Sequence, residues 1–249
     1  ITYSFVSHEQ HFTRADIMSS LKPYDTSSEL YKQYTAEEYP HIIKTEKLKK
    51  LAHTIVGEEK NPVLQASMIY DWIATNFPWA GAREYSTIPN IPEYVVENRH
   101  GDCGQVALLY ITLVRCLGIP ARWESGFMLH PGAENYHDWA ETYFEGTGWV
   151  ATDPSFGRST TGESLADYYK TGIDLYRFVV NKGVNGSFDP KKNYIRSETV
   201  DNQAGEVEWK NGNLEYKDWT SDLHVDSCIK IDINRPEYSW ALTKLSVAS

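Results

Sequence analysis

The chain has 249 residues, of which 41% are hydrophobic and 23% are charged, a composition that suits a soluble protein with a substantial core. Its formal net charge of −10 argues against binding to nucleic acid, which requires a basic surface. No apolar run approaches the roughly 20 residues that cross a bilayer. Three cysteines allow at most one disulfide, so the sequence is not a disulfide scaffold.

The first part of the chain predicts helices. Apolar residues recur at helical spacing within residues 27–56, and Pro40 interrupts them, which indicates two helices. Residues 62–77 predict an amphipathic helix capped by Asn61. Proline and glycine make residues 78–92 a loop, and a short helix follows near the sequence PEYVVEN.

A central helix is predicted from about Cys103 to Leu117, with its end at Gly118. Three strands follow, with the sequences ARWESGFML, HDWAETYF and WVATD, and EGTG joins the last two as a hairpin. Residues 158–200 give no clear pattern, and residues 206–233 predict another hairpin around an Asn-Gly turn. This order predicts an α+β fold in which N-terminal helices pack on an antiparallel β-sheet.

Cys103 stands at the predicted start of the central helix, between Asp102 and Gly104. Unpaired backbone amides at a helix start favour negative charge, so this position is expected to lower the pKa of the thiol. We interpret Asp102 as the helix cap, although its negative charge opposes that effect. Cys116, inside the same helix, is interpreted as a core residue. Cys103 is therefore the candidate nucleophile.

A thiol nucleophile needs a base that a third group orients, and the predicted hairpin offers both. His137 opens its first strand and Asp153 closes its second. A two-residue turn would place these side chains on opposite faces of the sheet. An odd-length loop or a bulge, which Gly146 or Gly148 could supply, restores a common face. The sequence thus permits a triad of Cys103, His137 and Asp153.

Two segments, GDCGQVALLYITLVRCLGIPARWESGF and HDWAETYFEGTGWVATDPSFG, resemble the transglutaminase-like superfamily in sequence and spacing. The core pattern of that superfamily is a Cys at a helix start, Gly-Ile-Pro-Ala-Arg after the helix, His-x-Trp-x-Glu on a strand, and Gly-Trp before Asp-Pro. All of these elements occur in order within about residues 62–157. The resemblance implies a core related to papain-like cysteine proteases. The segment from Leu175 to Trp219 resembles extensions of large secreted Bacteroidetes members.

By this resemblance Cys103 is the nucleophile, His137 the general base and acid, and Asp153 the residue that orients His137. The implied reaction is acyl transfer through a thioester, which passes its acyl group to water or to an amine. The backbone N–H of Cys103 is one candidate donor to the oxyanion. Superfamily members use an upstream Trp as a second donor and papain relatives an upstream Gln, which favours Trp79 over Gln105.

We expect hydrolysis of peptide or amide bonds rather than protein crosslinking, because nothing suggests the calcium sites or large flanking domains of animal transglutaminases. The alternatives are a protein-glutamine transglutaminase and a non-catalytic module that holds peptide or glycan. No cofactor or metal is expected, since His8 and His11 lack zinc-protease spacing and no paired cysteines support a zinc site at Cys103. The expected partner is a peptide or protein substrate.

The resemblance also suggests how the chain is organised. We expect a helical N-terminal extension over residues 1–60, the catalytic core over residues 61–160, and an α/β extension of the same domain over residues 161–249. The chain opens on Ile1 without the charged and apolar regions of a signal peptide, which predicts a mature or excised piece. An acidic chain with 8 Trp and 17 Tyr suits an extracytoplasmic setting, and the resemblance to secreted Bacteroidetes members implies a periplasmic, cell-surface or secreted one.

Overall fold

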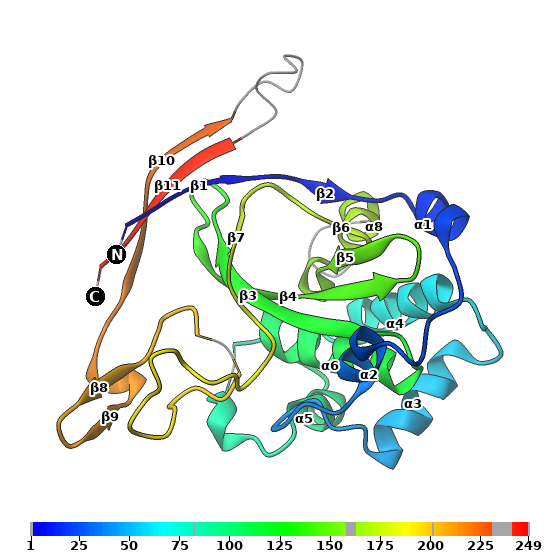
Figure 1. Ribbon diagram of the computed structural model, residues 1–249, viewed down its shortest axis with the longest axis horizontal. Helices are drawn as coiled ribbons and strands as arrows, with labels where there is room; N and C mark the ends of the chain where they lie inside the picture. The colour runs from blue at the N-terminus through cyan, green and yellow to red at the C-terminus, as the bar shows by residue number, and fades with distance from the viewer. Residues whose placement is uncertain (1, 82, 158–162, 201, 231–240, 249) are drawn as a thin grey trace.

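The computed structural model describes residues 2–248 apart from residues 82, 158–162, 201 and 231–240 (Figure 1). Its α-helices are α1 (Arg14–Ser20), α2 (Glu29–Thr35), α3 (Glu46–Val56), α4 (Pro62–Asn76), α5 (Ile91–Asn98), α6 (Cys103–Cys116) and α8 (Glu163–Lys170). Short 3-10 helices lie at η1 (Tyr85–Thr87), η2 (Pro154–Phe156) and η3 (Tyr216–Asp218). Among the helices described, none is long and apolar enough to span a bilayer.

The strands of the described residues form antiparallel sheets. A four-stranded sheet has the order β5-β4-β3-β7, and a three-stranded sheet has the order β1-β11-β10. Two further pairs are β2-β6 and β8-β9. The larger sheets contain β1 (Thr2–Ser7), β3 (Ala121–Met128), β4 (Asn135–Phe144), β5 (Gly148–Thr152), β7 (Arg177–Lys182), β10 (Asp222–Lys230) and β11 (Ala241–Ala248). The pairs contain β2 (Gln10–His11), β6 (Gly172–Ile173), β8 (Val207–Trp209) and β9 (Gly212–Leu214). The predicted α+β class is confirmed.

Helix α6 is the centre of the core and packs on one face of the four-stranded sheet (Figure 1). Asp102 caps it by accepting from the N–H of Gln105, whose side chain in turn accepts from the N–H of Asp102. Twelve successive residues, 104–115, are buried, as expected for a helix that is apolar on every side. The chain leaves the helix through Gly118, whose φ of +77° suits glycine. The predicted cap and helix end are confirmed.

The register of the β4–β5 hairpin decides which side chains meet. Phe144 pairs with Gly148 and Ala140 with Thr152, so three residues form the loop. Gly146 in that loop has a φ of +96°, a conformation open to glycine. The odd-length loop puts residues 137, 139 and 153 on one face of the sheet, while Tyr110 of α6 reaches Thr142 on the other face, 2.8 Å between their oxygens.

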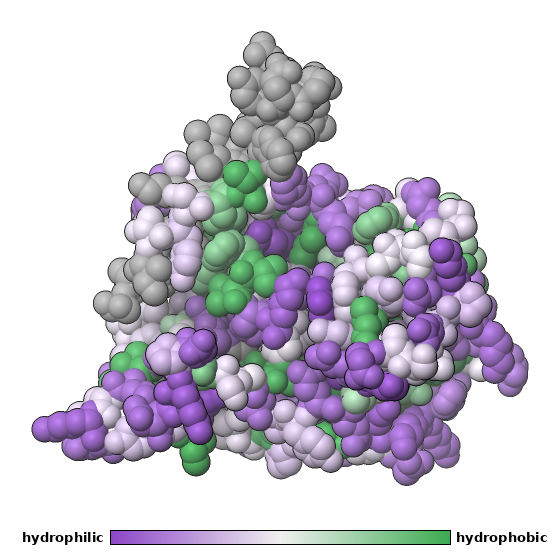
Figure 2. All heavy atoms as spheres, in the orientation of Figure 1, coloured by the Kyte–Doolittle hydropathy of each residue, from purple (hydrophilic) through white to green (hydrophobic). Residues whose placement is uncertain are grey.

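The two ends of the chain differ most from expectation. Residues 2–7 form β1 and pair with β11, so the segment 1–60 is not a helical extension throughout. The Asn-Gly turn joins β8 and β9 as predicted, but these strands have three residues each, and residues 222–230 pair instead with β11. Figure 2 shows hydrophobic residues gathered over β1 and β7, where Phe5 stacks on Phe178 at 4.3 Å between ring centroids. These contacts join the N- and C-terminal parts of the chain.

Candidate active site

Cys103 is the first residue of α6 and half-buried, beside the helix cap of Asp102 and Gln105. Gly104 follows it in a tight space, since a methyl group there would overlap the Tyr85 hydroxyl and the Asp138 carboxylate. Helix and sheet are therefore in close contact at the thiol. Cys116 at the other end of α6 is also a free thiol, and the side chain of Cys228 lies outside the described residues.

His137 and Asp153 form a buried pair on the sheet face that the hairpin register selects. His137 Nε2 and Asp153 Oδ2 lie 2.7 Å apart, and the nitrogen donates because a carboxylate only accepts. The side chains are 7% and 0% exposed. The other oxygen of Asp153 accepts from the backbone N–H and the hydroxyl of Ser155. Asp153 thus fixes the imidazole with its Nδ1 free of any hydrogen bond to a described residue.

Arg177 completes this pair, and no sequence pattern singled it out. Its Nη1 lies 3.0 Å from Asp153 Oδ2 and its Nε 3.1 Å from Asp174 Oδ2, with the side chain 3% exposed. The guanidinium also lies over the Phe156 ring, 5.0 Å from its centroid. Arg177 stands at the start of β7, the strand beside β3, so tertiary pairing alone brings it to the hairpin.

Electrostatics in this pair keep the acid ionised and the base neutral. Burial opposes charge on Asp153, but its interactions with His137 and with the Arg177 guanidinium outweigh burial and lower the pKa of that carboxyl. Burial lowers the pKa of His137, and the Arg177 charge acts in the same direction, against the attraction of Asp153. His137 is therefore a neutral imidazole near pH 7 and can accept a proton.

The structure corrects the expectation that the helix start lowers the pKa of the Cys103 thiol. Burial raises that pKa well above its usual value, and the carboxylates of Asp138 and Asp102 add to the effect. The Cys103 Sγ donates to Asp138 Oδ2 at 3.5 Å and makes no hydrogen bond with His137. The described arrangement is thus a neutral thiol held by Asp138, and of the three triad candidates only His137 and Asp153 are bonded to each other.

Of the two oxyanion candidates, Trp79 is the one that lines the pocket over Cys103. Its backbone forms a bridge with Gly101, two residues before Cys103, and its side chain is 61% exposed. Trp79 and Cys103 line the same pocket. Gln105 instead uses its side-chain carbonyl in the helix cap and is 1% exposed. Donation by Trp79 to an oxyanion stays a prediction.

The pocket over Cys103 has a volume of about 350 Å³. The described residues that line it come from the loop around η1, the start of α6, the start of β4 and the loop before β8: Trp79, Arg83, Glu84, Tyr85, Asp102, Cys103, Asn135, Tyr136, Asp138, Glu198 and Gln203. Acidic and aromatic side chains predominate. Within the described residues, no group of three or more His, Cys, Asp or Glu is arranged to hold a metal ion.

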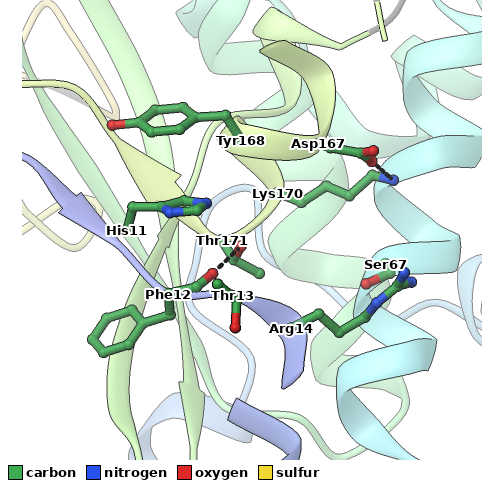
Figure 3. A pocket seen from close by; sticks show the side chains of 9 residues that line it. All are labelled: His11, Phe12, Thr13, Arg14, Ser67, Asp167, Tyr168, Lys170 and Thr171. Carbon is green, nitrogen blue, oxygen red and sulfur yellow. Dashed lines mark hydrogen bonds and ion pairs between the residues drawn. The ribbon is translucent and has the colours of Figure 1, made fainter. Parts of the chain in front are cut away.

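A second pocket of about 430 Å³ lies between α1, α4 and α8 (Figure 3). His11 stacks on Tyr168 at its edge, 4.8 Å between ring centroids, and Lys170 is paired with Asp167 at 2.7 Å. His11 is therefore an exposed residue with an aromatic neighbour. None of the triad candidates lines this pocket.

We predict that Asp138→Asn lowers the apparent pKa of Cys103, because it removes the nearest carboxylate while its amide oxygen can still accept from Gln203. The measurement is the pH dependence of iodoacetamide labelling, mapped by mass spectrometry, with the exposed Asp25→Asn as control. The wild-type thiol should titrate above the ordinary value of about 8.5. Equal titration of Cys103 in wild type and Asp138→Asn would contradict the account.

Replacing Arg177 should move the acidic limb of kcat/KM to higher pH. The Arg177 charge lowers the pKa of His137, so in the Arg177→Gln variant the His137 imidazole should already be protonated at higher pH. In wild type that limb should lie below the ordinary histidine value of about 6.5. Arg177→Lys keeps the charge and should move the limb back towards wild type. An identical acidic limb of the kcat/KM profile in all three proteins would show that Arg177 does not affect the pKa of His137.

Residues 49–154 match the model of the transglutaminase-like superfamily, which confirms the resemblance drawn from the motifs. Over 149 residues the chain is 25% identical to YebA of Bacillus subtilis strain 168, a protein described as uncharacterised. That match covers 52% of this chain and 20% of YebA. The chain thus spans one fifth of the length of this relative.

Two solved structures show distant similarity. A candidate cysteine protease of Cytophaga hutchinsonii is 20% identical, with a TM-score of 0.47, over 62% of this chain and 65% of its own. The periplasmic domain of TgpA from Pseudomonas aeruginosa is 18% identical, with a TM-score of 0.43, over 55% and 53% of the two chains. Both are too distant to indicate a substrate for this protein.

Proposed function

We propose that this chain, whose residues 49–154 form a transglutaminase-like domain, is an enzyme that hydrolyses peptide or amide bonds through a thioester on Cys103. The observation that carries the proposal is the buried His137–Asp153 hydrogen bond of 2.7 Å, on the hairpin that packs against the helix start holding Cys103. A thiol, a neutral base and an ionised acid are the groups that acyl transfer by a cysteine requires.

The first half-reaction forms the thioester. The Cys103 sulfur attacks the substrate carbonyl carbon as its proton passes to His137 Nδ1, the ring nitrogen left without a hydrogen bond to a described residue. Asp153 stabilises the imidazolium that results. The tetrahedral oxyanion lies near the N–H of Cys103, and Trp79 is the proposed second donor. Collapse breaks the C–N bond, and His137 returns its proton to the leaving amine.

The second half-reaction regenerates the thiol. His137 takes a proton from water, whose oxygen attacks the thioester carbonyl, and the C–S bond then breaks. The products are the carboxylic acid and the Cys103 thiol, which recovers the proton held by His137. A primary amine that replaced water would give an amide, so access to the thioester decides between hydrolysis and transamidation.

The test uses glutamine-containing peptides in H₂¹⁸O, with and without a primary amine such as putrescine. Hydrolysis gives an acid that carries one ¹⁸O, whereas transamidation releases ammonia and gives a product that gains the mass of the amine less that of ammonia, without ¹⁸O. We expect the ¹⁸O acid to predominate even with the amine present. Predominance of the amine adduct would replace hydrolysis with transamidation.

Cleavage at a backbone amide would appear as new peptide termini in the same experiment. The alternative of a non-catalytic binding module predicts that wild-type protein forms none of these products faster than Cys103→Ala does. The extracytoplasmic setting and the three-part organisation, residues 1–60, 61–160 and 161–249, stay predictions beside this function.

A further inference from the structure

The pocket beside Cys103 carries an excess of negative charge. Its described lining has four carboxylates, from Glu84, Asp102, Asp138 and Glu198, against the guanidinium of Arg83. Arg83 is exposed, and its guanidinium lies 6.0 Å from the centroid of the Tyr94 ring. Tyr94 does not line this pocket. Asp102 is occupied as the cap of α6 and by the Tyr85 hydroxyl at 2.6 Å. A substrate that enters therefore meets a negative potential.

Glu198 is a buried lining carboxylate that forms no ion pair with a described residue. The residue is 6% exposed, and its Oε1 accepts from the N–H groups of Thr199 and Val200 at 2.6 and 2.9 Å. Its Oε2 makes no hydrogen bond or ion pair with a described residue, although the side chain lines the pocket. Burial raises the pKa of Glu198 to about 7, and nearby Glu84 adds to the effect, although the backbone N–H groups and the charge of Arg196 act against it. A buried carboxylate in this state is stabilised by a positive charge.

Asp138 lies at the reacting end of the same pocket. Its Oδ2 is 3.5 Å from the Cys103 sulfur, and its Oδ1 accepts from Gln203 at 2.5 Å. A positive group near Asp138 would offset the negative charge that disfavours the thiolate. The same group would therefore favour binding and help to activate the nucleophile. The exposed Trp79 ring adds an aromatic face that a cation can also contact.

We propose that the acyl substrate of this pocket carries a positive charge next to the reactive amide, and that Glu198 and Asp138 bind that charge. The inference rests on the proposed function, because it assigns the pocket to the acyl donor. The positive charge can come from a basic side chain or from a free α-amine. Both sources present an ammonium or guanidinium group to the carboxylates, and the experiment separates them.

Binding is measured by calorimetry on the inactive Cys103→Ala protein, so that turnover plays no part. The probes are N-acetylated peptide amides that differ only in the residue before the reactive carboxamide, which is lysine, norleucine or glutamate. A norleucine peptide with a free α-amine is the fourth probe. We expect the lysine peptide or the free-amine peptide to bind about tenfold more tightly than the acetylated norleucine peptide at low salt. The glutamate peptide should bind most weakly, and added salt should reduce the differences.

A Glu198→Gln change in the Cys103→Ala protein should reduce the ratio of the cationic-peptide affinity to the acetylated norleucine-peptide affinity towards one. The amide keeps the Oε1 acceptor but loses the charge. Glu58→Gln, at an exposed residue beyond the end of α3, is the matched control and should keep the ratio. Equal affinities of the acetylated lysine, the free-amine and the acetylated norleucine peptides, or no binding of the cationic peptides, would overturn the proposal. A preference that survives Glu198→Gln would overturn the assignment to Glu198.

Turnover of the same peptides by the wild-type protein tests the proposed function separately. Cationic peptides that bind preferentially but are never converted would leave the inference standing and remove the proposed function. Conversion at equal kcat/KM for the lysine, free-amine and norleucine peptides, with equal binding, would support the enzyme and remove the inference.

Discussion

Cys103→Ala is expected to lower kcat/KM for peptide amides by about 10⁴-fold or more. The change removes the sulfur that forms the thioester, and neither His137 nor water can replace it in the first half-reaction. Alanine suits a helix start and leaves the Asp102 and Gln105 cap in place. The measurement is initial rates across substrate concentration, with the melting temperature followed in parallel.

Cys116→Ala is the matched control for that loss. Cys116 is a half-buried free thiol at the other end of α6, and burial raises its pKa to about 11, which makes it a poor nucleophile. The variant should keep wild-type kcat/KM. Equal activity of Cys103→Ala and wild type would show that the reaction does not pass through this sulfur.

Asp153→Asn should lower kcat by on the order of 10³-fold or more. The carboxylate accepts from His137 Nε2 and so holds Nδ1 in the proton-accepting state, whereas an amide can donate and favour the other tautomer. The amide also provides no negative charge to stabilise the imidazolium. Because His137 and Asp153 are both buried, solvent does not readily replace the lost interaction.

Asp174→Asn separates this effect from a general disturbance of Arg177. Asp174 contacts the same guanidinium, with Nε to Oδ2 at 3.1 Å, and has no hydrogen bond to His137. Both changes should lower the melting temperature, since each leaves Arg177 with one acid. A fall in kcat of equal size in the two variants would mean that Asp153 acts through Arg177 and not through the imidazole.

The central helix and the hairpin could be predicted because local signals specify them. Asp102 and Gly118 mark the ends of α6, and the glycines of EGTG mark the turn between β4 and β5. Whether the side chains of His137 and Asp153 lie on the same face of the sheet depended on one further feature, the three-residue loop between the two strands. Glycines at 146 and 148 indicated that such a loop was possible but did not determine its length.

The protonation state of the thiol could not be predicted from the motif. A helix start favours a thiolate, and only Asp102 was visible as an opposing charge. Asp138 follows His137 in sequence, and neighbouring residues of a strand point to opposite faces. Because α6 packs on the face opposite His137, the strand directs Asp138 towards the helix start and the sulfur.

The remaining surprises come from pairing between distant segments. Arg177 lies in a stretch without clear periodicity, and it reaches Asp153 because β7 pairs with β3. The N-terminal strand β1 pairs with β11 across nearly the whole chain. Short strands whose partners lie so far away in sequence give little local signal.

The most direct test of cysteine-dependent acyl transfer is to catch the acyl group on the protein during turnover. Wild-type protein is mixed with a converted peptide amide, quenched in acid within milliseconds to seconds, digested and mapped by mass spectrometry. The account predicts a mass increase equal to the substrate acyl group on the peptide that contains Cys103, removed by hydroxylamine as a thioester should be. Turnover without any adduct there, or with the adduct on another residue, would contradict it.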